Sequence, residues 1–316
     1  MVQVGPVMKQ LKLIQNLLEM IRFSHTIFAL PFALLAAVMA WTASTNHQDI
    51  LFNWVHLLGI VVAMVGARSA AMAFNRLVDR NIDAGNERTK SRHLPAGKLS
   101  VASVIIFTVV SVIVYLIGTA MFWPNYLPLA VSIPVLFVLL GYSYTKRFTS
   151  LAHFWLGAAL ALAPICAWIA VRGQEVISNP LDVLPAVVLG AAVMFWVSGF
   201  DMIYACQDYQ FDKEAKLNSI PVLLGVPGSL RLAAICHFLM IALLIALPFT
   251  ESVVGIELGL GWIYAVAIAL IAGLLIYEHR LVSPSDLTRV NVAFFNVNAV
   301  VSIGLFFLAA IDLLWL

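Results

Sequence analysis

Residues 51–83 read LFNWVHLLGIVVAMVGARSAAMAFNRLVDRNID, and this stretch decides the fold. It begins with an apolar run over residues 51–75, and about 20 such residues span a bilayer as an α-helix. It ends with a polar cluster that contains Asn75, Asp79 and Asp83. We therefore expect a membrane-spanning helix that carries polar groups to the bilayer surface.

The whole chain has the composition of a membrane protein. Of its 316 residues, 62% are hydrophobic and 11% are charged, whereas soluble domains carry about 25% charged residues. Nine apolar segments are long enough to span a bilayer: residues 24–43, 51–75, 101–122, 125–145, 151–171, 183–206, 229–249, 257–277 and 291–311. We expect an all-α, polytopic membrane protein with nine transmembrane helices around a central cavity, and no nucleic-acid partner.

The basic residues indicate the orientation, because short cytoplasmic loops are enriched in Lys and Arg. All but two of the 18 Lys and Arg residues lie on one side of the predicted bilayer; the exceptions are Arg172 on the other side and Arg68 within a span. We expect the N-terminus and the polar cluster in the cytoplasm and the C-terminus outside. A bacterial inner membrane is the expected location.

A second acidic cluster, Asp208-Tyr209-Gln210-Phe211-Asp212, follows the sixth predicted span. Four spans separate the two clusters, so both reach the same face of the bilayer. This spacing predicts one domain, residues 1–316, in which a four-helix unit is repeated at roughly 20–148 and 150–278, with a ninth helix added. Asp201 lies deeper in the sixth span, and an ionisable group in a membrane helix is usually functional.

The two clusters predict a site for metal ions and a diphosphate. Asn75, Asp79 and Asp83 share one face of a helix, and Mg²⁺ binds carboxylate and amide oxygens. Asp208 and Asp212 would hold a second ion, since a leaving diphosphate is stabilised by more than one metal. The alternative is that these groups are solvated charges at the membrane edge.

Arg68 is the basic residue that departs most from its surroundings, because it lies within the apolar run. We expect it to bind an anion in the cavity; the alternative is a structural salt bridge to Asp201. Positive-inside topology alone would explain the other basic residues, but they are also candidates for substrate contact. The predicted substrate-binding residues also include Tyr204, which shares a helix face with Asp201. The full set is Arg22, Arg88, Lys90, Arg92, Lys146, Arg147 and Tyr204.

Together these motifs resemble the UbiA superfamily of intramembrane aromatic prenyltransferases. The family signatures are NDxxDxxxD and DxxxD; here the first reads Asn75-Arg76-x-x-Asp79-x-x-x-Asp83 and the second Asp208-x-x-x-Asp212. Arg76 stands where the long form of the first signature has Asp. Residues 200–208, 88–97 and 21–26 are similar to quinone-pathway members, and the likeness spans nearly the whole chain.

The resemblance implies transfer of a polyprenyl group from polyprenyl diphosphate to an aromatic acid, such as 4-hydroxybenzoate in ubiquinone biosynthesis. Two Mg²⁺ ions would hold the diphosphate, and the cation formed on ionisation would alkylate the ring ortho to a hydroxyl. Asp201 is expected to be a site residue or to orient one, and Tyr204 to contact the substrate. The resemblance assigns metal binding to Asn75, Asp79, Asp83, Asp208 and Asp212, and diphosphate binding to Arg68, Lys146 and Arg147.

Two alternatives stay open at this point. Within the family, the acceptor could be a dihydroxynaphthoate of menaquinone biosynthesis. Outside it, a secondary transporter or cation channel also uses membrane carboxylates, although these would then lie near the bilayer midplane and on broken helices. The sequence leaves the acceptor, the length of the prenyl chain and the oligomeric state open.

Overall fold

The computed structural model describes residues 6–21, 28–44 and 50–315, and these ranges contain helices and no sheet. The all-α prediction is confirmed. The long helices are α1 (Pro6–Met20), α2 (Leu30–Thr42), α3 (Trp54–Gly85), α4 (Val101–Ala120), α5 (Leu127–Thr145), α6 (Ala152–Ser178), α7 (Leu184–Ala205), α9 (Ile220–Ala246), α11 (Trp262–Arg280) and α12 (Asn298–Trp315). The short ones are η2 (Pro180–Val183), η3 (Cys206–Asp208), α8 (Tyr209–Glu214), η4 (Leu247–Phe249), α10 (Thr250–Val254) and the π-helical η5 (Val292–Val297).

Within the described ranges, eight helical segments are long and apolar enough to cross a membrane, and α2 is a shorter apolar helix. These match eight predicted spans, and α2 lies within the first predicted span. Residues 22–27 of that span lie outside the described residues. Helix α1 was not predicted from the sequence.

Residues 207–228, between the sixth and seventh predicted spans, are largely helical. They contain the end of η3, α8 and the first turns of α9, which begins at Ile220. The Ser219 hydroxyl caps α9 by accepting from the Val222 N–H across 3.4 Å, as serine does at helix N-termini. Gly225 has φ 69° and kinks α9 there, a conformation that glycine adopts without strain.

Helix α3 positions the first polar cluster. The Asn53 side chain begins this helix by accepting from the Val55 N–H across 2.8 Å, and the helix runs for 32 residues. That length corresponds to about 48 Å, whereas the hydrocarbon core of a bilayer is about 30 Å thick. The end that carries Asn75 to Asp83 therefore extends beyond the hydrocarbon core.

Small residues bring the helices close together. A Cβ atom on Gly66 of α3 would lie 2.5 Å from the Tyr115 nitrogen of α4, and one on Gly118 of α4 would lie 2.5 Å from the Ala63 nitrogen of α3. Gly157 of α6 packs equally tightly against α7, since a Cβ atom there would lie 2.4 Å from the Met194 carbonyl oxygen. The hydrophobic effect does not drive helices together in lipid, so van der Waals packing at such close contacts stabilises the bundle instead.

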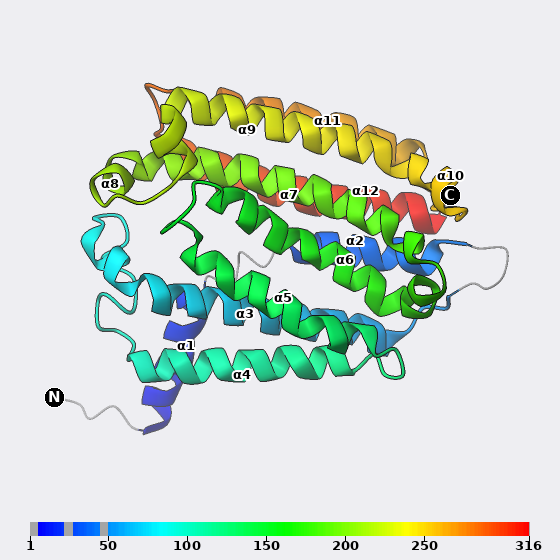
Figure 1. Ribbon diagram of the computed structural model, residues 1–316, viewed down its shortest axis with the longest axis horizontal. Helices are drawn as coiled ribbons and strands as arrows, with labels where there is room; N and C mark the ends of the chain where they lie inside the picture. Colours follow the sequence, from blue (N-terminus) through cyan, green and yellow to red (C-terminus); the bar gives the residue numbers. More distant parts are fainter. Residues whose placement is uncertain (1–5, 22–27, 45–49, 316) are drawn as a thin grey trace.

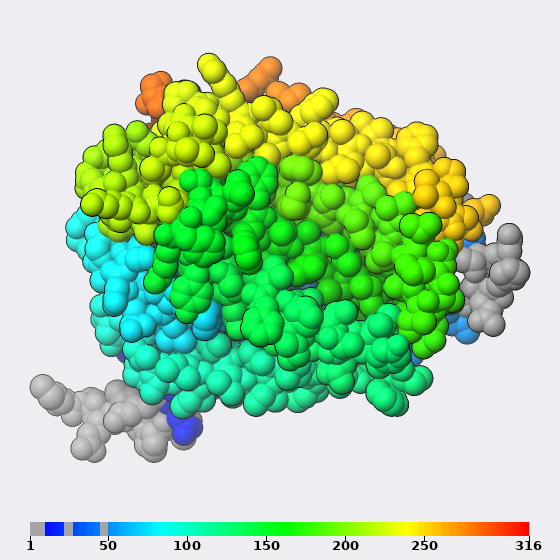
Figure 2. Space-filling model, in the orientation of Figure 1, coloured from blue at the N-terminus to red at the C-terminus, as the bar shows by residue number. Residues whose placement is uncertain are grey.

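The helices form one bundle with the two acidic segments at the same end (Figure 1). Helices α3 and α4 lie side by side, α9 and α11 lie on the opposite side, and α5, α6 and α7 lie between them. Figure 2 shows the segment after α3, in cyan, meeting the yellow-green segment around α8 at this end. The first and second clusters therefore converge in space although more than 120 residues separate them.

A buried ion pair stabilises the other end of the bundle. The Arg172 guanidinium donates to the Asp182 carboxylate at 2.8 Å, and both side chains are almost fully buried. Arg172 also donates to the carbonyls of Ala40 and Ala43, where α2 ends. This residue, predicted to lie on the opposite side from the other basic residues, thus ties α2 to α6.

Asp182→Ala is expected to destabilise the protein by about 3–5 kcal/mol, because it leaves the Arg172 charge buried without its partner. Thermal unfolding in detergent measures this as a lower midpoint. The control is Glu257→Ala, since Glu257 is an exposed acid whose backbone pairs with Ser44 near the end of α2. Equal midpoints for the two variants would contradict the stabilising role of the pair.

Candidate active site

A cavity of about 370 Å³ runs through the bundle between α3, α5, α6 and α7. One end reaches Phe122 and Pro128, and the other reaches the segments around Asp83 and Asp212. Most of its wall is apolar. The charged side chains that line it are five acids, Asp79, Asp83, Asp201, Asp208 and Asp212, and five bases, Arg68, Arg76, Arg88, Arg92 and Lys146.

The first cluster forms a connected set on α3. The Asn75 amide donates to Asp79 Oδ2 across 3.1 Å, and Asn75, Asp79 and Asp83 are all buried and line the cavity. The Arg76 guanidinium donates to Asn75 Oδ1 at 3.4 Å and lies 4.0 Å from Asp83 Oδ2. The basic residue at position 76 therefore belongs to the same polar cluster.

The second cluster does not lie on one continuous helix. Asp201 is on α7, which ends at Ala205; Asp208 ends the 3₁₀ turn η3, and Asp212 is on α8. These three residues therefore do not follow α-helical periodicity, because a 3₁₀ turn has three residues per turn. All three side chains nevertheless line the same cavity.

Basic side chains already neutralise the carboxylates of the first cluster. Lys146 Nζ lies 2.9 Å from Asp79 Oδ2, and Arg92 donates to Asp83 Oδ1 at 2.7 Å. Arg147 lies 3.5 Å from Asp79 Oδ1 and also donates to a backbone carbonyl of α3. These predicted substrate-binding residues are therefore within reach of anything held by the carboxylates.

Arg88 links the two clusters. Its guanidinium forms a bidentate ion pair with Asp208 and donates to the Tyr204 hydroxyl at 2.9 Å. Burial lowers the pKa of Arg88, but its hydrogen bond and ion pair with Asp208 outweigh this effect and raise the pKa above its ordinary value. The Asn86 amide donates to Asp208 Oδ1 at 3.1 Å. The segment after α3 is thereby joined to η3.

Of the predicted substrate-binding residues that the structure describes, Lys90 and Arg147 do not line the cavity. Lys90 pairs with Glu87 at 2.5 Å on the surface and does not line the cavity, because the turn after α3 directs Arg88 and Arg92 inward instead. Arg22 lies outside the described residues.

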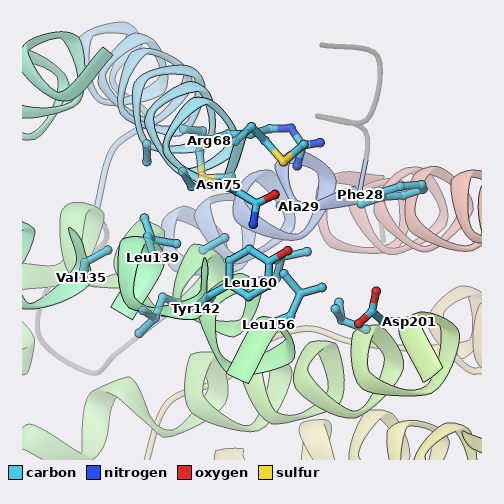
Figure 3. Close-up of a pocket in the computed structure, with 18 of the residues that line it drawn as sticks. Phe28, Ala29, Arg68, Asn75, Val135, Leu139, Tyr142, Leu156, Leu160 and Asp201 are labelled. Carbon is cyan, nitrogen blue, oxygen red and sulfur yellow. The ribbon is translucent and has the colours of Figure 1, made fainter. Parts of the chain in front are cut away.

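Arg68 projects from α3 into the cavity, two helical turns before Asn75 (Figure 3). The distance along the helix is about 10 Å. Its Nε is buried and has no hydrogen-bond partner among the described residues. The alternative of a salt bridge to Asp201 is wrong, since Asp201 pairs with His153. Arg68 is partly buried, and a charge that is withdrawn from water without a carboxylate partner is costly; the site therefore suits an anionic ligand.

Sequence analysis missed three residues of the site: Asn86, Tyr142 and His153. Asn86 follows the last residue of α3 and has an extended backbone, so helix periodicity does not place its side chain. Tyr142 and His153 are polar residues at the ends of apolar spans. Nothing in a single sequence distinguishes them from other residues at the membrane surface.

The carboxylates fit Mg²⁺ that arrives together with a phosphorylated ligand. Among the described residues, no three His, Cys, Asp or Glu side chains form a ready-made metal site. Mg²⁺ commonly takes one or two protein carboxylates and completes its shell with water and substrate phosphate oxygens. Asp79 with Asn75, and Asp208 with Asp212, supply donor sets of this kind.

Metal binding is therefore expected to depend on diphosphate. The affinity for Mn²⁺, a paramagnetic substitute for Mg²⁺, should rise at least about tenfold when a non-hydrolysable prenyl diphosphate analogue is present, which is an ordinary coupling between two ligands. Titration followed by electron paramagnetic resonance measures this directly. Equal Mn²⁺ affinity with and without the analogue would contradict it.

Comparisons with known proteins agree with this geometry. Residues 29–300 match the UbiA prenyltransferase family. A relative from Methylococcus capsulatus, named 4-hydroxybenzoate octaprenyltransferase, is 30% identical over 286 residues, which cover 87% of each chain.

Two solved structures have the same fold. The apo structure of a UbiA homologue from Aeropyrum pernix K1 has a TM-score of 0.79 and 33% identity, covering 92% of this chain and 98% of that one. A UbiA homologue from Archaeoglobus fulgidus, bound to DMAPP and Mg²⁺, has a TM-score of 0.60 and 18% identity, covering 91% and 99%.

The apolar helices and the charged end of their cavity define a multi-pass membrane protein with a polar site. The family match identifies it as an enzyme that transfers prenyl groups. The chain belongs to the UbiA prenyltransferase family. This membership decides against the transporter or channel alternative.

Proposed function

We propose that this protein transfers a polyprenyl group from polyprenyl diphosphate to the ring of 4-hydroxybenzoate in quinone biosynthesis. The observation that carries the acceptor class is Arg68, whose Nε is buried in the cavity wall and has no hydrogen-bond partner among the described residues. The names of the bacterial relatives support the same acceptor. The distribution of basic residues supports a cytoplasmic site in a bacterial inner membrane.

When metal ions and diphosphate enter the charged end of the cavity, they would replace the ion pairs between its acidic and basic side chains. Five acids and five bases line the cavity, and the principal carboxylates are already paired. Cations added to the acids and a polyanion added to the bases keep this balance. We assign one Mg²⁺ to Asn75 and Asp79, near Asp83, and a second to Asp208 and Asp212.

When bound, Mg²⁺ would stabilise the charge that develops on the leaving diphosphate. Lys146 lines the cavity beside Asp79, so its ammonium can move onto the diphosphate once a metal ion occupies the carboxylate. Arg88 and Arg92 can do the same from the segment after α3. The basic side chains thus hold the leaving group in place.

The acceptor would lie between α3 and α7. Arg68 is about 10 Å along α3 from Asn75, so we assign it to the acceptor carboxylate in preference to the diphosphate. Asp201 projects from α7 on the opposite wall, as Figure 3 shows. Arg68 and Asp201 would therefore hold the carboxylate end and the hydroxyl end of the ring.

The reaction breaks the bond between the allylic carbon and the diphosphate oxygen, and the electron pair stays with the diphosphate. The ring carbon ortho to the hydroxyl then bonds to the allylic carbon and afterwards loses its proton. Phe200, Tyr204 and Phe294 line the cavity, and aromatic faces stabilise cations. The apolar wall, which includes Leu156 and Leu160, excludes water that would otherwise capture the allylic cation.

The acceptor is tested with purified protein, Mg²⁺ and labelled geranyl or longer prenyl diphosphate. Separate reactions contain 4-hydroxybenzoate, 1,4-dihydroxy-2-naphthoate or no acceptor. We expect prenylated 4-hydroxybenzoate, identified by mass spectrometry. Product from the naphthoate alone would instead support the menaquinone alternative, and no product from either acceptor would contradict the proposal.

A further inference from the structure

His153 lies beside the cavity but outside the two acidic clusters. It is the second residue of α6, and its side chain is 6% exposed. Its Nδ1 is 2.7 Å from Asp201 Oδ2, and the backbone N–H of Ile220 donates to its Nε2 across 3.4 Å. The ring therefore contacts α7 and the first residue of α9.

These two contacts determine which ring nitrogen carries the hydrogen. A neutral imidazole has one N–H donor and one acceptor nitrogen. A backbone N–H only donates, so Nε2 is the acceptor and Nδ1 carries the hydrogen. Nδ1–H of His153 therefore donates to Asp201, a bond that is strongest when the carboxyl group is ionised.

The second oxygen of Asp201 is left for a ligand. Within the described part of the chain, Oδ2 is held by His153 and no hydrogen bond involves Oδ1. The Asp201 side chain is 24% exposed and lines the cavity. In Figure 3 it points toward the space below Arg68 and Asn75. One fixed oxygen and one unpaired oxygen are what a base needs in order to face its substrate.

We propose that His153 is a positioning residue for prenyl transfer: it holds the Asp201 carboxylate oriented so that Oδ1 accepts the phenolic proton of the acceptor. This inference rests on the proposed function. The phenolic proton moves to Oδ1 as the ring carbon bonds to the allylic carbon. The ring C–H proton then leaves to the diphosphate, and Oδ1 returns its proton to the oxygen, which restores the phenol and the carboxylate.

Helix packing does not depend on the His153 ring alone. The Ser198 hydroxyl of α7 lies within hydrogen-bond distance of the backbone carbonyl of His153, at 3.3 Å, and Gly157 packs against α7 one turn further along α6. Both contacts remain when the ring is replaced. Variants at position 153 therefore test the contact with Asp201 and leave the docking of α6 on α7 in place.

The test compares His153→Leu with His153→Asn. An Asn amide nitrogen occupies nearly the position of Nδ1 and can still donate to Asp201, whereas Leu cannot. Since a hydrogen bond to a charged group contributes about 1.5–3 kcal/mol, kcat is expected to fall about 10- to 100-fold in His153→Leu. His153→Asn should recover most of this loss, and the KM for the prenyl diphosphate should stay nearly constant in both variants.

A more acidic acceptor distinguishes this role from a structural one. If His153 served only to stabilise the fold, the loss of kcat would be the same with both acceptors. Fluorine ortho to the hydroxyl of 4-hydroxybenzoate makes the phenol more acidic, so its proton needs less help from Asp201. The loss of kcat in His153→Leu is therefore expected to be smaller with the fluorinated acceptor. The control is His56→Leu, since His56 is on α3 and does not line the cavity; it should leave kcat unchanged for both acceptors.

Equal losses in His153→Leu and His153→Asn, or an equal loss with both acceptors, would overturn the role of His153. Asp201→Asn is measured in parallel. If that variant is inactive while His153→Leu is fully active, the assignment of Asp201 as the proton acceptor stands and the assignment of His153 as its positioning residue is overturned. If Asp201→Asn is fully active, both assignments fail. The proposed function fails separately, if the unaltered protein forms no product from either acceptor.

Discussion

Asp79→Asn and Asp208→Asn are each expected to lower kcat/KM for prenyl transfer at least about a thousandfold, which corresponds to about 4 kcal/mol. Asn preserves the shape of the side chain but removes the charge that would hold Mg²⁺ and its diphosphate. Both residues line the cavity, and Asp79 is 3% exposed. Initial rates with saturating Mg²⁺ and labelled donor measure the loss.

The matched control for these variants is Glu87→Gln. Glu87 is an acid in the segment between Asp79 and Arg88, but its side chain is 87% exposed and pairs only with Lys90. Removing its charge should change kcat/KM by less than about threefold, since exposed pairs contribute about 1 kcal/mol or less. Near-normal turnover in Asp79→Asn and Asp208→Asn would show that the two clusters do not hold the metal ions.

Arg68→Met is expected to raise the KM for 4-hydroxybenzoate about 100-fold and to leave the KM for the prenyl diphosphate nearly unchanged. Met fills much of the same apolar space but offers no charge to the acceptor carboxylate. Truncating one partner of a buried charged pair costs about 2–5 kcal/mol, and each 1.4 kcal/mol is a tenfold change in affinity. Steady-state kinetics with each substrate varied in turn separates the two KM values.

Arg80→Met is the matched control for Arg68→Met. Arg80 is on the same helix, but it is exposed and its guanidinium donates to a backbone carbonyl of α3. Comparing 4-hydroxybenzoate with its neutral amide sharpens the test, because the preference for the acid should disappear in Arg68→Met only. A rise in the KM for the diphosphate instead would return Arg68 to the leaving group, as the resemblance to the family first implied.

Most of the fold could be predicted because bilayer spans leave a strong signal. A run such as residues 101–122 contains no charged residue, and no alternative to a membrane helix buries it. The structure places α4 at Val101–Ala120. Helix α8 and the start of α9 were not predicted, because short helices at a membrane surface need not be apolar. Ser219 and Gly225 act there through a cap and a kink that hydropathy does not record.

The candidate site was predictable where its residues share one helix. Asn75, Asp79 and Asp83 follow helix periodicity, so their common face could be derived. The roles of Arg92 and Lys90 could not, because they lie two residues apart in one turn. Only Arg92 contacts a cavity carboxylate, while Lys90 pairs with Glu87 on the surface. Local sequence carries no information on which side chain of a turn faces inward.

The sequence by itself determined that this chain is a bundle of membrane helices with two acidic clusters at one face, since burial in lipid and helix periodicity are local properties. Only the tertiary structure decided what each charge contacts. It joins Arg88 to Asp208 and His153 to Asp201, and among the residues that the structure describes it gives the Nε of Arg68 no partner. The physical reason is that a buried charge is stabilised by whichever group packing brings within about 4 Å, and packing depends on the whole chain.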